Sequence, residues 1–201
     1  MRSIIVLGQT NVGKTLFTIN FAHYLGIESL TFKFIDHRGE YTRTYTISQA
    51  IEFLVSPKPH FTRALHSIVL SMPWGKGRKA FELLDTAGLT NGIHQDEQVR
   101  KAMGQTLTAV READLIFHLF DAAEIGKRDL LSAVSDVDYQ VAQFGQMRAG
   151  YLVLANKMDL PLAKDGLRKL QDSFPGHVVI PISALYKTGF KEVKSFVRKH
   201  L

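Results

Sequence analysis

The chain has 201 residues and a net charge of +6, and 45% of its residues are hydrophobic while 22% are charged. This balance is typical of a globular protein, and no linker, repeat or low-complexity tract divides residues 1–201, so we expect a single domain. The absence of cysteine excludes disulfides, thiolate metal sites and lipid anchors on cysteine, and it favours a cytoplasmic location. The apolar runs are too short for a membrane span, so we expect no membrane association.

The first half of the chain alternates short apolar runs with helical patterns. Its predicted strands cover residues 2–8, 64–72 and 79–85, and its predicted helices cover 14–25 and 48–56. The last two of these strands flank the tight connection Pro-Trp-Gly-Lys-Gly-Arg, which demands antiparallel pairing.

The second half repeats a rhythm of strands and helices. Strands are predicted at 113–121, 149–157 and 177–183, and helices at 95–111, 129–144, 162–172 and 188–200. The runs Leu-Ile-Phe-His-Leu-Phe and Tyr-Leu-Val-Leu-Ala look buried on both faces, as parallel strands between helices are. We therefore predict an α/β fold with a mostly parallel six-stranded sheet, one antiparallel strand near an edge, and helices on both faces.

A phosphate-binding motif, Gly-Gln-Thr-Asn-Val-Gly-Lys-Thr, occupies residues 8–15 between a predicted strand and a predicted helix. The two glycines let the backbone curl so that its amides point at phosphate oxygens, and the start of the helix adds its positive end. Lys14 would reach the terminal phosphates, and the Thr15 hydroxyl would bind Mg²⁺. The residues assigned to nucleotide binding here are Gly8, Asn11, Val12, Gly13, Lys14, Thr15 and Leu16.

Two further motifs follow predicted strands. Asp85 ends a strand in Asp-Thr-Ala-Gly, where its carboxylate would hold Mg²⁺ through water while the Gly88 amide faces a terminal phosphate. In Asn-Lys-Met-Asp, residues 156–159, the carboxylate of Asp159 can accept two hydrogen bonds from guanine, whereas adenine offers no such pair of donors.

The same base site would be completed by neighbouring residues. Asn156 would tie its loop to the phosphate loop, and the stem of Lys157 would pack on the base. The Ala184 amide, between Ser183 and Leu185 after the next strand, would reach the guanine carbonyl oxygen.

These motifs, in this order, resemble the P-loop GTPase domain of the translation-factor class over essentially the whole chain. Asn11-Val12, Arg-Glu-Ala-Asp-Leu-Ile-Phe-His-Leu-Phe-Asp-Ala and Ser-Ala-Leu-Tyr-Lys-Thr-Gly-Phe are most similar to the bacterial Era/Der/TrmE-type GTP-binding proteins. The resemblance implies a Mg²⁺-dependent switch that hydrolyses GTP to GDP and phosphate, associated with ribosome assembly or tRNA modification. Two departures are expected: no appended RNA-binding domain, and an unusually long switch segment at about 26–62.

The long segment should contain the threonine that meets Mg²⁺ and the terminal phosphate. We favour Thr62, which immediately precedes the second strand, where this branch carries Thr-Thr-Arg, over Thr42, which lies closer to the phosphate loop in the sequence. The residues between would then be an insertion that acts as a lid, a surface for a protein effector or a packed excursion.

The position after Gly88 raises the question of how a water would be held for hydrolysis. Many guanine-nucleotide switches carry glutamine there, but this chain has Leu89, whose side chain cannot hydrogen-bond a water. The remaining sources are the switch backbone, a polar neighbour, K⁺ or a residue from a partner. The resemblance implies K⁺ beside Asn11. The residues assigned to catalysis are Asn11, Lys14, Thr62 and Gly88. The candidates for holding the water are the polar neighbours Thr90, Asn91 and His94, and the candidates for neutralising charge are Arg38, Arg43 and Arg63.

Three functions remain open at this point. A GTP-hydrolysing switch is favoured, a non-hydrolysing module that presents a nucleotide-ordered surface to a protein is the alternative, and an adenine-specific enzyme is the third. The net charge of +6 favours RNA or the ribosome as a partner, although it serves solubility equally well. The basic residues on or beside the last helix are Lys187, Lys191, Lys194, Arg198 and Lys199.

Overall fold

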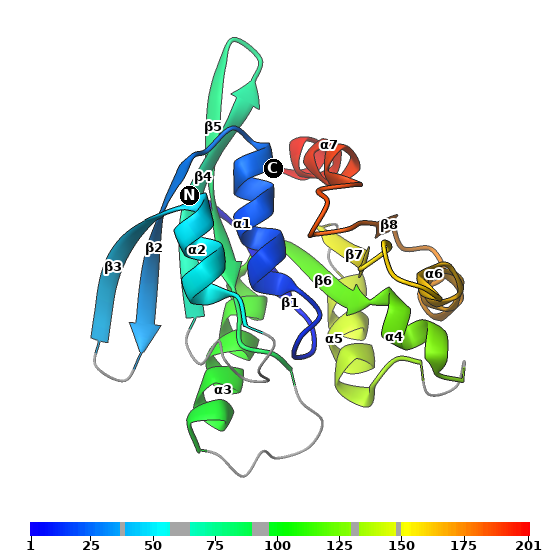
Figure 1. Cartoon of the computed structure of the whole chain (residues 1–201). Helices are drawn as coiled ribbons and strands as arrows, with labels where there is room; N and C mark the ends of the chain where they lie inside the picture. Colours follow the sequence, from blue (N-terminus) through cyan, green and yellow to red (C-terminus); the bar gives the residue numbers. More distant parts are fainter. Residues whose placement is uncertain (37–38, 57–64, 90–96, 130–132, 148–149) are drawn as a thin grey trace.

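The computed structural model describes the whole chain apart from residues 37–38, 57–64, 90–96, 130–132 and 148–149 (Figure 1). Its strands form one sheet in the order β3-β2-β4-β5-β1-β6-β7-β8. The strands are β1 Arg2–Leu7, β2 Ser29–Asp36, β3 Gly39–Thr46, β4 Leu65–Trp74, β5 Gly77–Asp85, β6 Leu115–Asp121, β7 Tyr151–Asn156 and β8 Val179–Pro181. The helices are α1 Lys14–Tyr24, α2 Ile47–Leu54, α3 Glu97–Glu112, α4 Ala122–Lys127, α5 Asp136–Gln146, α6 Ala163–Ser173 and α7 Phe190–His200.

The predicted fold class is confirmed, but the sheet in the described residues has eight strands in place of the expected six, and two strands, β4 and β3, run against the others in place of one near the edge. The strands β5, β1, β6, β7 and β8 run parallel, and β4 pairs antiparallel with β5 through the tight turn at Gly75. The two additional strands, β2 and β3, form a hairpin that continues the sheet beyond β4 and makes β3 the edge strand (Figure 1).

The hairpin and α2 come from the long segment after α1. Phe32 and Phe34 of β2 are buried, and their alternation with polar neighbours has the period of a half-buried strand. The helix α2 begins with a capping box, in which Thr46 and Gln49 satisfy each other's backbone amides, and it buries Ala50 near α1. The described residues of this segment therefore pack against the rest of the fold, β2 and β3 by extending the sheet and α2 by lying near α1.

The sheet is covered on both faces. Successive residues of β1 alternate between two apolar clusters: Ile4 and Val6 belong to the first, Ile5 and Leu7 to the second. The first cluster also includes residues of α1, α2 and α7, and the second includes residues of α3, α4, α5 and α6. This double burial explains why the central strands are apolar almost without interruption.

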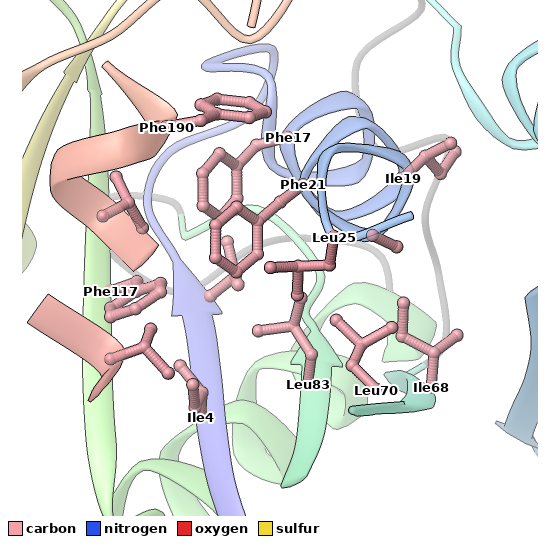
Figure 2. Close-up of a cluster of buried hydrophobic side chains, with 14 of the residues drawn as sticks. Ile4, Phe17, Ile19, Phe21, Leu25, Ile68, Leu70, Leu83, Phe117 and Phe190 are labelled. Carbon is pink, nitrogen blue, oxygen red and sulfur yellow. The ribbon is translucent and has the colours of Figure 1, made fainter. Parts of the chain in front are cut away.

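Aromatic side chains fix α1 against the sheet and α7. Phe17 and Phe21 of α1 stack with ring centroids 5.5 Å apart, and Phe190 of α7 meets both rings edge-on (Figure 2). Phe117 of β6 lies 6.1 Å from Phe17. Because α1 follows the phosphate loop directly, this packing also anchors the carboxyl end of that loop.

One predicted helix is wrong in its boundaries. The helix predicted over 129–144 corresponds to α5, which begins only at Asp136, and the short helix α4 precedes it. Asp121 caps α4 and Ser135 caps α5, because each side chain accepts a hydrogen bond from a backbone amide of the first turn. None of the helices in the described part of the chain has the length and apolar character of a membrane span.

Candidate functional site

The phosphate loop curls between β1 and α1, where two glycines permit conformations that other residues cannot adopt. Gly8 has φ +142° and Gly13 has φ +97°. A Cβ on Gly8 would lie 2.2 Å from the carbonyl oxygen of Leu119, and one on Gly13 would lie 2.5 Å from Nδ2 of Asn156. Asn11 also adopts a positive φ, of 62°. The loop thus requires glycine at both positions of the sequence motif.

Lys14 folds back over this loop. Its Nζ donates hydrogen bonds to the carbonyl oxygens of Gly8, at 3.1 Å, and Gln9, at 2.7 Å. Burial lowers the pKa of Lys14 to about 8, and the carboxylates of Asp85 and Asp138 partly oppose this shift. The ammonium group therefore already lies inside the loop whose bound phosphates it would neutralise.

Thr15 and Asp85, the two residues predicted to hold Mg²⁺ here, lie in contact. The Thr15 hydroxyl donates to Asp85 Oδ2 at 2.7 Å, and Asp85 Oδ1 has no hydrogen-bond partner among the described residues although it is buried. Burial raises the pKa of Asp85 to about 6. A hydroxyl beside a carboxylate with an unused oxygen fits Mg²⁺, which favours oxygen ligands and keeps several waters.

The turn that carries Gly88 lies directly on the phosphate loop. A Cβ on Gly88 would lie 2.5 Å from Cγ2 of Thr10, and the Leu89 amide donates to the carbonyl oxygen of Gly8 at 2.9 Å. The Leu89 side chain is only 2% exposed and packs in the second apolar cluster. In this conformation Leu89 contributes apolar packing and a backbone hydrogen bond to the phosphate loop.

Asn156 links the phosphate loop to the base loop. Its Nδ2 donates to the Val12 carbonyl oxygen at 2.7 Å, and its Oδ1 accepts from the Ala184 amide at 2.8 Å. The Ala184 carbonyl oxygen in turn accepts from Asn20 of α1 at 2.7 Å. These bonds hold three segments that are far apart in the sequence in one rigid junction.

The remaining base-site residues surround this junction. Asp159 is exposed, and its Oδ1 accepts a 2.5 Å hydrogen bond from the Ser183 hydroxyl, which orients the carboxylate. Lys157 Nζ lies 2.6 Å from Asp121 Oδ2. Leu185 is 56% exposed beside them. Leu16 is partly buried against the first apolar cluster, so only its backbone would be available to a nucleotide.

The two candidates for the switch threonine have different outcomes. Thr62 lies outside the described residues, as do Arg38, Arg63, Thr90, Asn91 and His94. Thr42 pairs with Lys33 in β3, and β2 and β4 separate that strand from β5, whose end carries Asp85. Three strand spacings amount to about 14 Å, so Thr42 cannot share a metal with Asp85 in this arrangement. Arg43, its neighbour in the edge strand, lies equally far from Asp85 for the same reason.

Sequence reasoning missed a polar group behind the phosphate loop. Gln9 donates from Nε2 to Asp138 Oδ2 at 2.5 Å, and the same carboxylate contacts His118 Nε2 at 2.9 Å. His118 lies within the apolar run of β6, and Asp138 lies on α5, so nothing in the local sequence connects them with residue 9.

Sequence comparison finds relatives that are named GTPase Obg. The chain is 30% identical over 164 residues to GTPase Obg of Alkaliphilus oremlandii, covering 77% of this chain and 37% of that protein. It is 29% identical over 119 residues to GTPase Obg of Fusobacterium nucleatum, covering 57% of this chain and 27% of the relative. The chain therefore spans about a third of the length of the curated relatives it matches.

Solved structures share the fold. A crystal structure of Era from Aquifex aeolicus bound to GDP and AlF₄⁻ superposes with a TM-score of 0.69 at 23% identity, covering 100% of this chain and 57% of the other. A complex of Era with MgGDPNP and part of 16S ribosomal RNA gives 0.67 at 22% identity, covering 100% of this chain and 56% of the other. The family model described as 50S ribosome-binding GTPase matches residues 42–157, from β3 to the start of the base loop. The chain belongs to this family of P-loop GTPases.

Proposed function

We propose that this domain binds GTP with Mg²⁺ and hydrolyses it slowly to GDP and phosphate as a molecular switch. The observation that carries the proposal is the junction made by Asn156, which bonds the phosphate loop at Val12 and the Ala184 loop at once. A phosphate site and a guanine site joined in this way suit one bound guanine nucleotide. The family description and the Obg and Era relatives support the same activity.

Each residue would have a distinct role. The backbone of residues 8–15 and the ammonium of Lys14 would bind the phosphates, and Asp159 with Ala184 would bind the guanine edge. Thr15, with Asp85 through water and Thr62 from the switch segment, would hold Mg²⁺, which supplies charge neutralisation between the phosphates. The amide of Gly88 would contact the terminal phosphate.

Hydrolysis requires assistance that position 89 does not give, and we assign it to K⁺ beside Asn11. A cation at this place would neutralise charge that develops on the transferred phosphoryl group, as an arginine does in other switches. We expect single-turnover hydrolysis with Mg²⁺ to be at least about 10-fold faster in potassium chloride than in sodium chloride at equal ionic strength. Asn11→Ala should remove most of this advantage while nucleotide binding persists.

The same measurement separates the two candidate functions. Equal slow rates in both salts would contradict the potassium assignment and point to the switch backbone or a partner. GTP that stays intact in both would support the alternative, a binding module in which nucleotide orders a surface for a protein effector. The burial of Leu89 favours this alternative, and the hairpin β2–β3 with α2 is the surface that we would assign to the effector.

We also propose an association with ribosomal RNA. The support is the family description, the RNA bound by Era in its complex, the net charge of +6 and the exposed basic residues of α7, Lys191, Arg198 and Lys199. If these three side chains contact phosphates of single-stranded RNA, raising salt from about 50 to 200 mM should lower the affinity about 20-fold. Fluorescence anisotropy with a labelled RNA would measure this slope, and a flat response would remove RNA as a partner of α7.

A further inference from the structure

A buried polar network lies behind the phosphate loop, and the proposed chemistry does not use it. Asp138 of α5 is its centre: Oδ1 contacts His118 Nε2 at 2.9 Å, while Oδ2 accepts from the Ser135 hydroxyl at 2.7 Å and from Gln9 Nε2 at 2.5 Å. His118 Nδ1 lies 2.8 Å from the hydroxyl of Tyr151. The side chains of His118 and Asp138 are 0% and 1% exposed.

The protonation of this network follows from its environment. Burial by itself would raise the pKa of Asp138, but the hydrogen bonds and charge of His118, with the hydrogen bonds of Ser135 and Gln9, bring that pKa below its usual value. Burial and the Asp138 charge raise the pKa of Tyr151. An ionised Asp138 therefore accepts from His118 Nε2, while His118 Nδ1 shares a hydrogen bond with the Tyr151 hydroxyl.

Gln9 is the point at which this network reaches the nucleotide site. Its side chain bonds Asp138, its carbonyl oxygen accepts from Lys14 Nζ at 2.7 Å, and its backbone forms a bridge with Leu89. One residue thus connects α5 with the phosphate-binding lysine and with the turn that follows Asp85. Removing the hydrogen bond between Gln9 and Asp138 would therefore disturb both Lys14 and the turn that follows Asp85.

A cavity beside Gln9 makes its hydrogen bond to Asp138 important for the position of the loop. A cavity of about 170 Å³ borders this part of the loop, and its lining includes Gln9, Asn11, Phe120 and Asp138. A backbone segment that faces a cavity has fewer packing contacts, so hydrogen bonds contribute more to fixing its position. The bond to Asp138 is charge-assisted, and such bonds are stronger than those between neutral groups.

We propose that Asp138 is a positioning residue for the nucleotide: acting through Gln9, it holds the phosphate loop in the form that binds phosphates. His118 holds one oxygen of the Asp138 carboxylate in place, and Ser135 orients the second. This assignment rests on the proposed guanine-nucleotide binding. It makes α5, a helix outside the nucleotide motifs, a determinant of how long nucleotide stays bound.

The experiment measures the release of a fluorescent GDP analogue from the full chain with Mg²⁺. Gln9→Leu leaves the contacts among Asp138, His118, Ser135 and Tyr151 intact and cuts only their link to the loop, so release should become about 10-fold faster. Tyr151→Phe is the matched control, because it removes a hydrogen bond at the opposite end of the same network. Its release rate should stay within about twofold of the wild type even where thermal stability falls.

A reciprocal exchange adds a rescue. Gln9→Glu alone places two carboxylates together and should accelerate release at least as much as Gln9→Leu. Combining it with Asp138→Asn restores one donor and one acceptor with their direction reversed, so slow release should return. Unchanged release in Gln9→Leu, or no rescue in the double variant, would overturn the positioning role. A wild-type chain that fails to bind the analogue would overturn the proposed function itself, and this assignment with it.

Discussion

Lys14→Ala should lower the affinity of the domain for GTP and GDP by about 1000-fold. The side chain is buried inside the phosphate loop, where its ammonium now donates to the carbonyl oxygens of Gly8 and Gln9. Bound phosphates would replace or share these acceptors, and two hydrogen bonds between charged groups at this burial account for a loss of that size. Titration with a fluorescent guanine nucleotide measures the change.

Lys169→Ala is the matched control for this substitution. Lys169 is also a partly buried lysine that donates to backbone carbonyl oxygens, among them Gly126 at 2.8 Å, but it lies on α6 and stabilises the end of α4. Its loss should reduce stability and leave nucleotide affinity unchanged. Equal losses of affinity in the two variants would mean that Lys14 acts through folding and would contradict its direct role.

The parts of the site that the sequence predicts are those in which local spacing decides the geometry. Gly8 and Gly13 lie at fixed positions in a turn between a strand and a helix, and the backbone conformation of that turn requires them. Thr15 and Asp85 are separated by 70 positions, yet they were predictable as a pair, because parallel strands bring their carboxyl ends to one edge of the sheet.

The contacts that sequence did not predict depend on tertiary packing. Gln9 and Asp138 are 129 positions apart, and Asp138 lies on a helix whose register no motif specifies. His118 appears in the sequence as one polar residue in an apolar strand, and only the neighbouring Tyr151 and Asp138 give it hydrogen-bond partners. Such networks become visible only when the packing of elements is known.

The hairpin β2–β3 was missed for a different reason. Its strands do show the alternation of a half-buried sheet, with Leu30, Phe32 and Phe34 on the buried face. From the sequence alone we interpret this segment as an insertion with a helix at 48–56 and predict no strand in it. The alternating pattern alone was a sufficient signal for β2, because period-two burial is specific to strands.

Asp159→Asn should change the base that the domain prefers. Guanine presents two adjacent donors, from N1 and the 2-amino group, and the carboxylate accepts both. An asparagine amide offers one acceptor and one donor, which matches xanthine, whose carbonyl replaces the amino group. We expect the ratio of GTP to XTP affinity to fall by about 1000-fold, since a site built for a hydrogen bond strongly rejects a ligand that leaves it unpaired.

Asp165→Asn controls for the general loss of an acidic side chain, because Asp165 lies on α6, where its side chain is 48% exposed and pairs with Arg168 at 3.2 Å. That variant should keep the wild-type preference for GTP. If Asp159→Asn also kept it, Asp159 would not read the base. Binding of ATP equal to that of GTP by the unaltered chain would contradict guanine selection altogether.

Because Ser183 donates to Asp159 Oδ1, Ser183→Ala should weaken GTP binding less than Asp159→Asn while preserving the choice of base. Such a difference would show that Ser183 orients the carboxylate, whereas Asp159 itself recognises the base.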